Sequence, residues 1–167
     1  MNYIRNFPDF PKQGIVFKDI SPLIQDAGAF KLAVDLLASR FAQQTIDIVV
    51  GVEARGYIIG AALAYKLGTG FAPIRKPGKL PGKTFAANYE LEYGVTTSEI
   101  HQDALSEGQR VLLVDDVLAT GGTLEAGLTL INKTQASIIG IAVLLELVEL
   151  AGREKLAGYQ IETLLTM

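Results

Sequence analysis

The sequence predicts an α/β fold in which a mostly parallel, twisted sheet is flanked by helices. Two observations support this prediction. Largely apolar runs, typical of strands buried on both faces, occupy residues 46–52, 110–114 and 136–145. Segments with helical spacing of apolar residues alternate with them, at 29–43, 57–67 and 124–133. Strands that alternate with helices favour parallel pairing through right-handed crossovers.

The size and charge of the chain narrow the functional classes. With 167 residues and 49% hydrophobic content, we expect a single domain, residues 1–167, with a sizeable core. A net charge of −3 gives no electrostatic reason to expect a nucleic-acid or membrane-surface partner. The chain has no Cys, which excludes disulfides and thiolate chemistry. It shows no secretory signal and no apolar run of the roughly 18–20 residues that span a membrane. We expect a soluble cytoplasmic protein.

The first 26 residues are rich in aromatic residues and proline. They contain Tyr3, Phe7, Phe10 and Phe17, together with three prolines, and proline spaced this closely disfavours a long helix. We therefore predict an irregular arm. The pattern alone is equally compatible with an arm that only packs on the core and with one that contributes to a site.

A second strand–turn–helix unit begins with the apolar run at 46–52. The run ends in Glu53-Ala54-Arg55-Gly56, and a helix with Gly68 as its stop follows. The turn matches neither a P-loop nor a dinucleotide fingerprint. Arg55 could bind a diphosphate, because its planar fork matches phosphate oxygens. From the tetrapeptide alone, a surface ion pair with Glu53 is the favoured interpretation.

The segment after the short strand at 71–74 combines cations with turn residues. Between 75 and 84 it carries two Pro, two Gly and the four cations Arg75, Lys76, Lys79 and Lys83. Such a segment is either a solvated loop or a mobile lid that closes over anionic groups. The alternating stretch at 89–94 predicts a strand, and an edge strand is the plainest interpretation. We assign no catalytic role to the lone His101.

The most informative stretch is 110–123. A buried strand leads into Asp115 and Asp116, followed by the small and hydroxyl residues of 119–123 and a helix at 124–133. A glycine-containing turn before a helix presents backbone N–H groups to an anion, and Thr hydroxyls add donors. Because carboxylates repel phosphate, their predicted partners are sugar hydroxyls or Mg²⁺. The stretch therefore predicts a site for a phosphorylated sugar.

Residues 114–123, Val-Asp-Asp-Val-Leu-Ala-Thr-Gly-Gly-Thr, resemble the 5-phosphoribosyl-1-pyrophosphate (PRPP) motif of type I phosphoribosyltransferases. The Leu-Ala-Thr-Gly-Gly-Thr variant is similar to that of adenine phosphoribosyltransferases, and the resemblance covers nearly the whole chain. It implies the type I phosphoribosyltransferase fold with a small N-terminal hood over the purine at 1–26. It also implies a flexible lid region at 75–93 and a homodimer.

The resemblance also implies site residues. For PRPP these are Glu53, Ala54, Arg55, Lys76, Lys79, Tyr93, Asp115, Asp116, Ala119, Thr120, Gly121, Gly122 and Thr123. For adenine they are Val16, Phe17, Lys18 and Leu118, with Phe17 stacking on the base and the backbone of Val16 and Lys18 pairing with its edge. The catalytic set is Glu92, Arg55, Asp115 and Asp116, and Glu92 would lie near the purine or its proton. No metal is bound by the protein alone, because Mg²⁺ is held mainly through PRPP or pyrophosphate.

The implied function is purine salvage, in which adenine and PRPP give AMP and pyrophosphate. One alternative is a phosphoribosyltransferase for a 6-oxopurine or orotate. Another is a non-catalytic PRPP-sensing regulator, which the charge balance disfavours. Both turns, at 53–56 and 115–123, follow strands at their carboxyl ends, where open α/β sheets bind ligands. We therefore expect the two turns to form one site.

Overall fold

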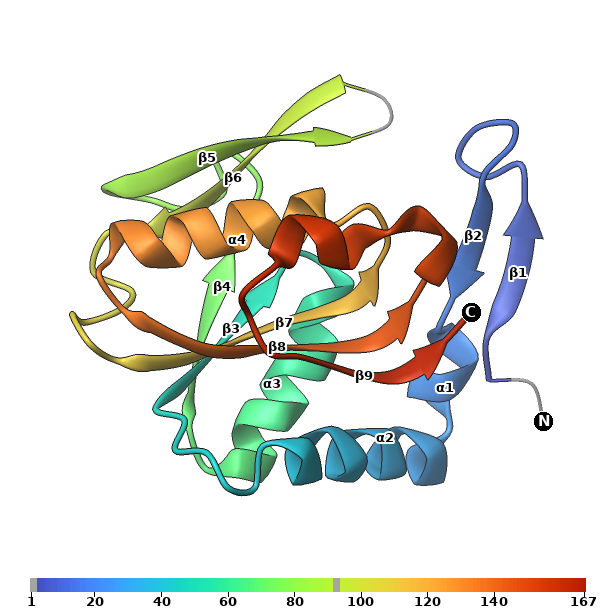
Figure 1. Ribbon diagram of the computed structural model, residues 1–167, viewed down its shortest axis with the longest axis horizontal. Coiled ribbons are helices and arrows are strands. Elements are labelled where there is room, and N and C mark those ends of the chain that lie inside the picture. Colours follow the sequence, from blue (N-terminus) through green and yellow to red (C-terminus); the bar gives the residue numbers. More distant parts are fainter. Residues whose placement is uncertain (1–2, 92–93) are drawn as a thin grey trace.

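A parallel five-stranded sheet forms the centre of the computed structural model, which describes residues 3–91 and 94–167 (Figure 1). The strand order is β4–β3–β7–β8–β9, and every neighbouring pair is parallel. The strands are β3 (Ile48–Val52), β4 (Gly70–Ile74), β7 (Arg110–Leu118), β8 (Ser137–Glu146) and β9 (Ile161–Thr166). The predicted sheet is therefore confirmed.

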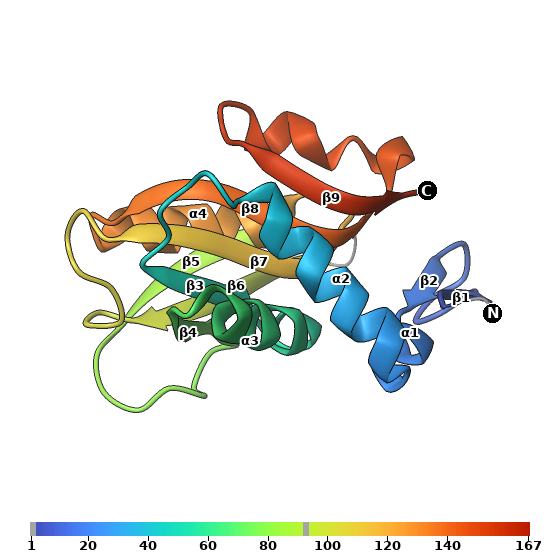
Figure 2. The same cartoon turned by 90° about the horizontal axis from the view of Figure 1, so that it is seen from below.

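Helices cover both faces of this sheet. The helices are α2 (Ala27–Arg40), α3 (Arg55–Leu67) and α4 (Gly122–Lys133). Figure 2 shows α2 and α3 on one face and α4 on the other. Consecutive strand residues supply the two cores: Val49 and Leu112 pack on the α2–α3 side, whereas Val50 and Leu113 pack on the α4 side. Burial on both faces explains why the strands are continuous apolar runs.

The N-terminal arm is more regular than predicted. It forms an antiparallel hairpin of β1 (Arg5–Pro8) and β2 (Val16–Asp19), followed by the short helix α1 (Ser21–Gln25). The side chain of Arg5 donates hydrogen bonds of 2.5 and 2.9 Å to Asp19 at the open end of the hairpin. The prolines of the hairpin lie at the end of β1 and in the loop between the two strands, which are positions where hairpins tolerate proline. The expectation of an irregular arm was therefore wrong.

A second hairpin packs over α4. Its strands are β5 (Thr84–Leu91) and β6 (Gly94–His101), and Lys133 of α4 donates a 2.5 Å hydrogen bond to the Ala86 carbonyl (Figure 1). Of the predicted strand at 89–94, residues 89–91 end β5 and Gly94 begins β6, while residues 92–93 lie outside the described residues. Of the proposed lid region, residues 75–83 connect β4 to this hairpin.

The chain closes with two 3-10 turns, η1 (Val148–Leu150) and η2 (Gly152–Leu156), between β8 and β9. Strand β7 runs further than predicted, because Val117 and Leu118 still pair with β8. Asp115 and Asp116 therefore lie within the strand rather than after it. In the described part of the chain, no helix is long and apolar enough to cross a membrane.

Candidate active site

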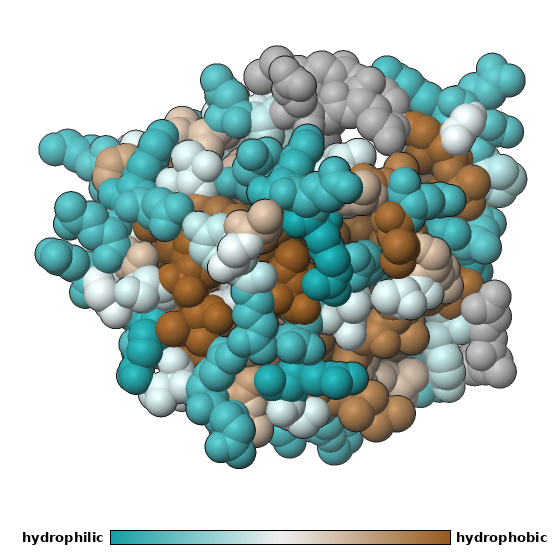
Figure 3. Space-filling view, viewed as in Figure 1, coloured by the Kyte–Doolittle hydropathy of each residue, from teal (hydrophilic) through white to brown (hydrophobic). Residues whose placement is uncertain are grey.

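A cavity of about 720 Å³ lies at the carboxyl ends of β3 and β7. Its walls come from the hood, the turn after β3, the start of the 75–83 segment, β5, β7 with its following turn, and η1. Its charged and aromatic lining includes Phe17, Lys18, Arg55, Lys76, Asp115 and Asp116. Figure 3 shows apolar side chains on the surface over the hood hairpin, beside the body of the molecule. The turns at 53–56 and 115–123 therefore line the same cavity, as expected from their positions at neighbouring strand ends.

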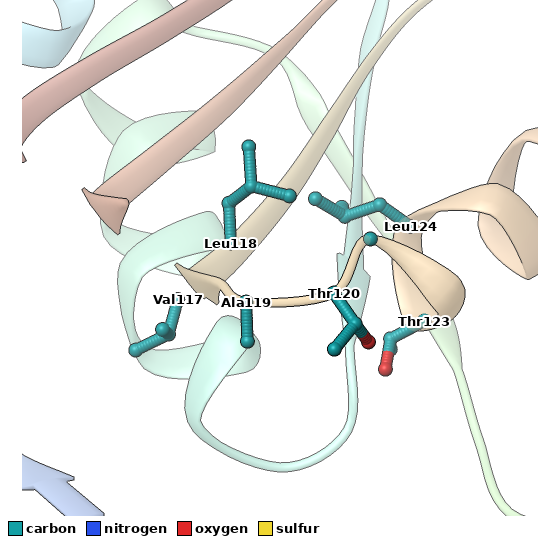
Figure 4. A pocket seen from close by; sticks show the side chains of 7 residues that line it. Val117, Leu118, Ala119, Thr120, Thr123 and Leu124 are labelled. Atoms are coloured by element: carbon teal, nitrogen blue, oxygen red, sulfur yellow. The ribbon is translucent and has the colours of Figure 1, made fainter. Parts of the chain in front are cut away.

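The turn between β7 and α4 surrounds a smaller hollow. Thr120, Gly121 and Thr123 line it, and Figure 4 shows the two threonine hydroxyls pointing to the same side. Gly121 adopts φ +82° as the N-cap of α4, a conformation that favours glycine. Because glycine offers no side-chain acceptor, the first N–H groups of α4 keep their donors for a ligand. This turn is built to hold an anion such as a phosphate.

The acid pair is buried beside this turn. Asp115 is 7% exposed and Asp116 is 5% exposed. The Asp116 N–H donates a 2.8 Å hydrogen bond to Asp115 Oδ1. Burial, and then the negative charge of Asp116, raise the pKa of Asp115 well above its usual value. Asp116 Oδ2 lies 2.7 Å from Arg55 Nε as an ion pair without hydrogen-bond geometry, so it keeps a lone pair for a donor on a ligand.

Arg55 connects the acid pair to the hood. Its Nε lies 2.7 Å from Asp116 Oδ2, and its Nη1 donates a 3.1 Å hydrogen bond to the Lys18 carbonyl. Its guanidinium also lies 4.7 Å from the centre of the Phe17 ring. The surface pair with Glu53, which the tetrapeptide alone favours, is replaced by this partly buried arrangement. Gly56 permits it, since a Cβ there would lie 2.9 Å from Asp115 Oδ1.

Glu53 has its own partners at the start of the 75–83 segment. Its carboxylate accepts hydrogen bonds from the Lys76 N–H at 2.9 Å and from Arg75 Nε at 3.3 Å. The backbone bond from Lys76 is the main cause of the lowered pKa of Glu53. Lys76 lines the cavity, while the Lys79 carbonyl accepts a hydrogen bond from Arg75. Glu53 therefore fixes the base of the proposed lid.

The predicted adenine residues divide into two groups. Val16, Phe17 and Lys18 line the cavity, and Phe10 packs edge-on against Phe17 with ring centres 5.2 Å apart. Leu118 is only 1% exposed and belongs to the core on the α4 side. Figure 4 shows it pointing toward Leu124, with Val117 on the other side of the strand. Val117, which the sequence analysis did not select, lines the cavity in its place.

The remaining residues of the cavity include several that were not predicted. Glu92 and Tyr93 lie outside the described residues. Tyr89, Leu147, Glu149 and Leu150 line the cavity without having been predicted. The alternation at 89–94 was the one signal for Tyr89. No sequence signal pointed to the η1 residues, because their position depends on how the chain returns from β8.

Comparisons with known proteins agree with this geometry. A family model described as the phosphoribosyl transferase domain matches residues 23–160. The adenine phosphoribosyltransferase of Halothermothrix orenii is 55% identical over 163 residues, covering 98% of this chain and 96% of that protein.

Solved structures agree as well. The adenine phosphoribosyltransferase of Thermoanaerobacter pseudethanolicus superposes with a TM-score of 0.96 at 50% identity, covering 99% of this chain and 96% of the other. The Saccharomyces cerevisiae enzyme, solved with adenine and an imino-altritol bisphosphate, gives 0.90 at 39% identity, covering 96% and 93%. This chain therefore belongs to the adenine phosphoribosyltransferases, within the phosphoribosyl transferase family.

Proposed function

We infer that this protein transfers the 5-phosphoribosyl group of PRPP to adenine, giving AMP and pyrophosphate in purine salvage. One observation carries the inference. A single cavity brings a phosphate-binding turn, a buried acid pair, an arginine and an aromatic ring together at the carboxyl ends of two neighbouring strands. The family to which the chain belongs performs this reaction.

We assign the parts of PRPP to the parts of the cavity by charge. The 5-phosphate occupies the turn at 119–123, where backbone N–H groups and two threonine hydroxyls are the donors. The ribose hydroxyls donate to Asp115 and Asp116. The diphosphate lies toward Arg55, which begins α3 without a side-chain N-cap, and toward Lys76. Each end of the substrate thus meets the uncapped N-terminus of a helix.

Magnesium fits this site through the substrate rather than through a protein cage. In the described part of the chain, no group of three or more His, Cys, Asp or Glu side chains could hold a metal. Asp116 Oδ2, buried and ion-paired with Arg55 but without a hydrogen bond, could accept a hydrogen bond from a water on a substrate-held Mg²⁺. When bound, Mg²⁺ would neutralise charge on the departing diphosphate. The expectation that PRPP supplies most of the metal ligands is retained as a proposal.

The residues of the chain stabilise a transition state in which the C1–O bond to the diphosphate breaks as the base attacks. Positive charge grows on the ribose ring, next to Asp115 and Asp116, while negative charge grows on the diphosphate near Arg55 and Lys76. These charged groups are already in position before the reaction, so little reorganisation is required. Each such interaction contributes about 10²–10³ in rate.

Adenine binds on the hood side of the cavity in this proposal. Phe17 stacks on the base, and the backbone of Val16 and Lys18 pairs with its edge. A 6-oxopurine would reverse donor and acceptor and leave buried groups unpaired. We assign the remaining apolar contact to Val117 instead of Leu118, because Val117 lines the cavity. The role of Glu92 in handling the purine proton stays a prediction.

The test is to supply the protein with PRPP and Mg²⁺ and with adenine, hypoxanthine, guanine or orotate in separate reactions. We expect nucleotide only from adenine. Its formation is monitored by the change in ultraviolet absorbance and by chromatography. Formation of a nucleotide from another base, and not of AMP from adenine, would favour one of the alternative transferases. Tight binding of PRPP without turnover of any base would favour the regulator.

We also propose that the protein is a homodimer formed through α2 and α3. Leu32 and Leu36 of α2 are 58% and 45% exposed, and Ile58 and Tyr65 of α3 are 41% and 90% exposed. Each pair shares one face of its helix by spacing. Light scattering after size exclusion should give twice the chain mass, and a monomer at micromolar concentration would refute the proposal. A cytoplasmic location stays a prediction.

A further inference from the structure

Gly152, which lies outside every motif discussed above, packs directly behind the phosphate-binding turn. A Cβ at this position would lie 2.2 Å from the Ala119 carbonyl oxygen and 3.0 Å from the Gly121 nitrogen. It would also lie 2.8 Å from Cδ1 of Leu118. The contact is mutual, because a Cβ on Gly121 would lie 2.5 Å from the Gly152 carbonyl oxygen. The two backbones therefore meet with no room for a side chain.

The segment that carries Gly152 is itself fixed to the sheet. Arg153 donates bonds of 2.6 and 2.7 Å to the two carboxylate oxygens of Glu146, whose side chain is only 7% exposed. The Leu147 N–H donates a 2.9 Å hydrogen bond to the Leu118 carbonyl. Leu156, 1% exposed, joins the core on the α4 side. These contacts hold the segment as a rigid support.

We propose that Gly152 is a positioning residue for the 5-phosphate of PRPP. Its missing side chain lets the η1–η2 segment close behind residues 118–121, and this contact sets where the phosphate turn lies. The inference rests on the proposed function, because it assigns the 5-phosphate to this turn. Gly152 touches the turn and not the substrate, so it acts through the geometry of the turn.

The backbone of Gly152 makes this role testable. Its φ lies outside the left-handed region, so alanine can adopt the same conformation and only the close contacts oppose it. A separation of 2.2 Å is on the order of 1 Å short of an ordinary carbon–oxygen contact, so the turn must shift by a similar distance. A shift of that size in a binding group commonly costs about 10²-fold.

The test is Gly152→Ala, with dissociation constants measured by calorimetry for ribose 5-phosphate, AMP and pyrophosphate with Mg²⁺. Ribose 5-phosphate and AMP need the turn, whereas pyrophosphate binds at the turn after β3. We expect binding of the first two to weaken about 10–100-fold and binding of pyrophosphate to change less than about 2-fold. The matched control is Gly70→Ala, whose added Cβ would lie 3.7 Å from Ile48; Gly70 is the first residue of β4 and does not line the cavity.

Three outcomes would overturn the proposal. These are unchanged ribose 5-phosphate binding in Gly152→Ala, equal weakening of all three ligands, or the same selective loss in Gly70→Ala. If Gly152→Ala does not fold, Arg153→Lys loosens the same support without adding an atom to the contact. That variant should weaken ribose 5-phosphate about 3–10-fold and leave pyrophosphate unchanged, and no selective effect would overturn the proposal. If the wild-type protein binds neither ribose 5-phosphate nor AMP, the proposed function itself fails.

Discussion

Replacing Asp115 with Asn should make the protein more stable and nearly inactive. The pKa of Asp115 is raised in the folded protein, first by burial and then by Asp116. A raised carboxyl pKa adds stability at pH values below the unfolded pKa, and this stability is lost as pH rises through the folded pKa. At neutral pH, which is above the unfolded pKa, the raised pKa of Asp115 therefore costs free energy of folding. Asparagine removes the charge and keeps an oxygen that can accept the 2.8 Å bond from the Asp116 N–H.

The same change at Asp116 should behave differently. Asp116 is paired with Arg55, but the Arg55 side chain is 36% exposed, so solvent limits the pair to about 1 kcal/mol. Losing the pair is offset by losing the repulsion from Asp115. We expect Asp115→Asn to gain about 0.5–2 kcal/mol, or several degrees in Tm, and Asp116→Asn to change Tm by less than about 2 °C. Each variant should lose about 10²–10³ in kcat.

Thermal unfolding at pH 7 and steady-state kinetics with adenine and PRPP measure both effects on the same preparations. Asp103→Asn is the matched control, because Asp103 is exposed and lies in the turn after β6. It should leave both Tm and kcat unchanged. A lower Tm for Asp115→Asn would refute the electrostatic argument. Full activity of Asp116→Asn with normal PRPP affinity would refute the ribose assignment.

Three further predictions concern the hood, the lid and acid stability. Phe17→Leu should raise the KM for adenine about 2–12-fold by removing ring stacking, and it should raise the KM for PRPP less than that in the same assay. Glu92→Ala should lower kcat more than adenine affinity, and an effect confined to KM would indicate a binding role. The pKa of Asp47 is lowered to about 2, chiefly by the side-chain hydrogen bonds of Arg110. Its stabilising contribution is therefore present above the unfolded pKa of 3.8 and lost as pH falls toward 2, so Asp47→Asn should flatten the decline of Tm across that interval. An equally steep decline in the variant would contradict this.

The sheet was predictable because its residues are buried on both faces. In β3, Val49 and Val50 serve opposite cores, so a parallel strand between two helix layers needs every position apolar. The meeting of the turns at 53–56 and 115–123 was predictable for a related reason. Carboxyl ends of neighbouring parallel strands share one edge of the sheet, so residues about 60 positions apart in the chain approach each other there.

Side-chain direction within β7 was not predictable. Leu112 and Val114 face the α2–α3 core, and strict alternation would send Leu118 the same way, yet it joins the α4 core with Leu113. The alternation is broken within the strand, so no period-two argument could choose between Val117 and Leu118 for the cavity. The partner of Arg55 was hidden for another reason. A tetrapeptide shows only its local acid, Glu53, whereas the acid that pairs with Arg55 comes from β7.

Arg55 makes the two halves of the cavity dependent on each other. Asp116 holds its Nε at 2.7 Å, and the same guanidinium lies over the Phe17 ring and bonds the Lys18 carbonyl. A change at Asp116 should therefore alter adenine binding as well as PRPP binding.

A double-mutant cycle on Asp116→Asn and Phe17→Leu tests this link through kcat/KM for adenine. Residues that share one network usually show coupling of about 0.5–3 kcal/mol. The energetic effects of mutations at separate sites add to within about 0.3–0.5 kcal/mol. Additive effects here would mean that the hood and the residues that bind PRPP act independently. Coupling of about 0.5–3 kcal/mol would instead mean that Arg55 links the ribose site to the adenine site.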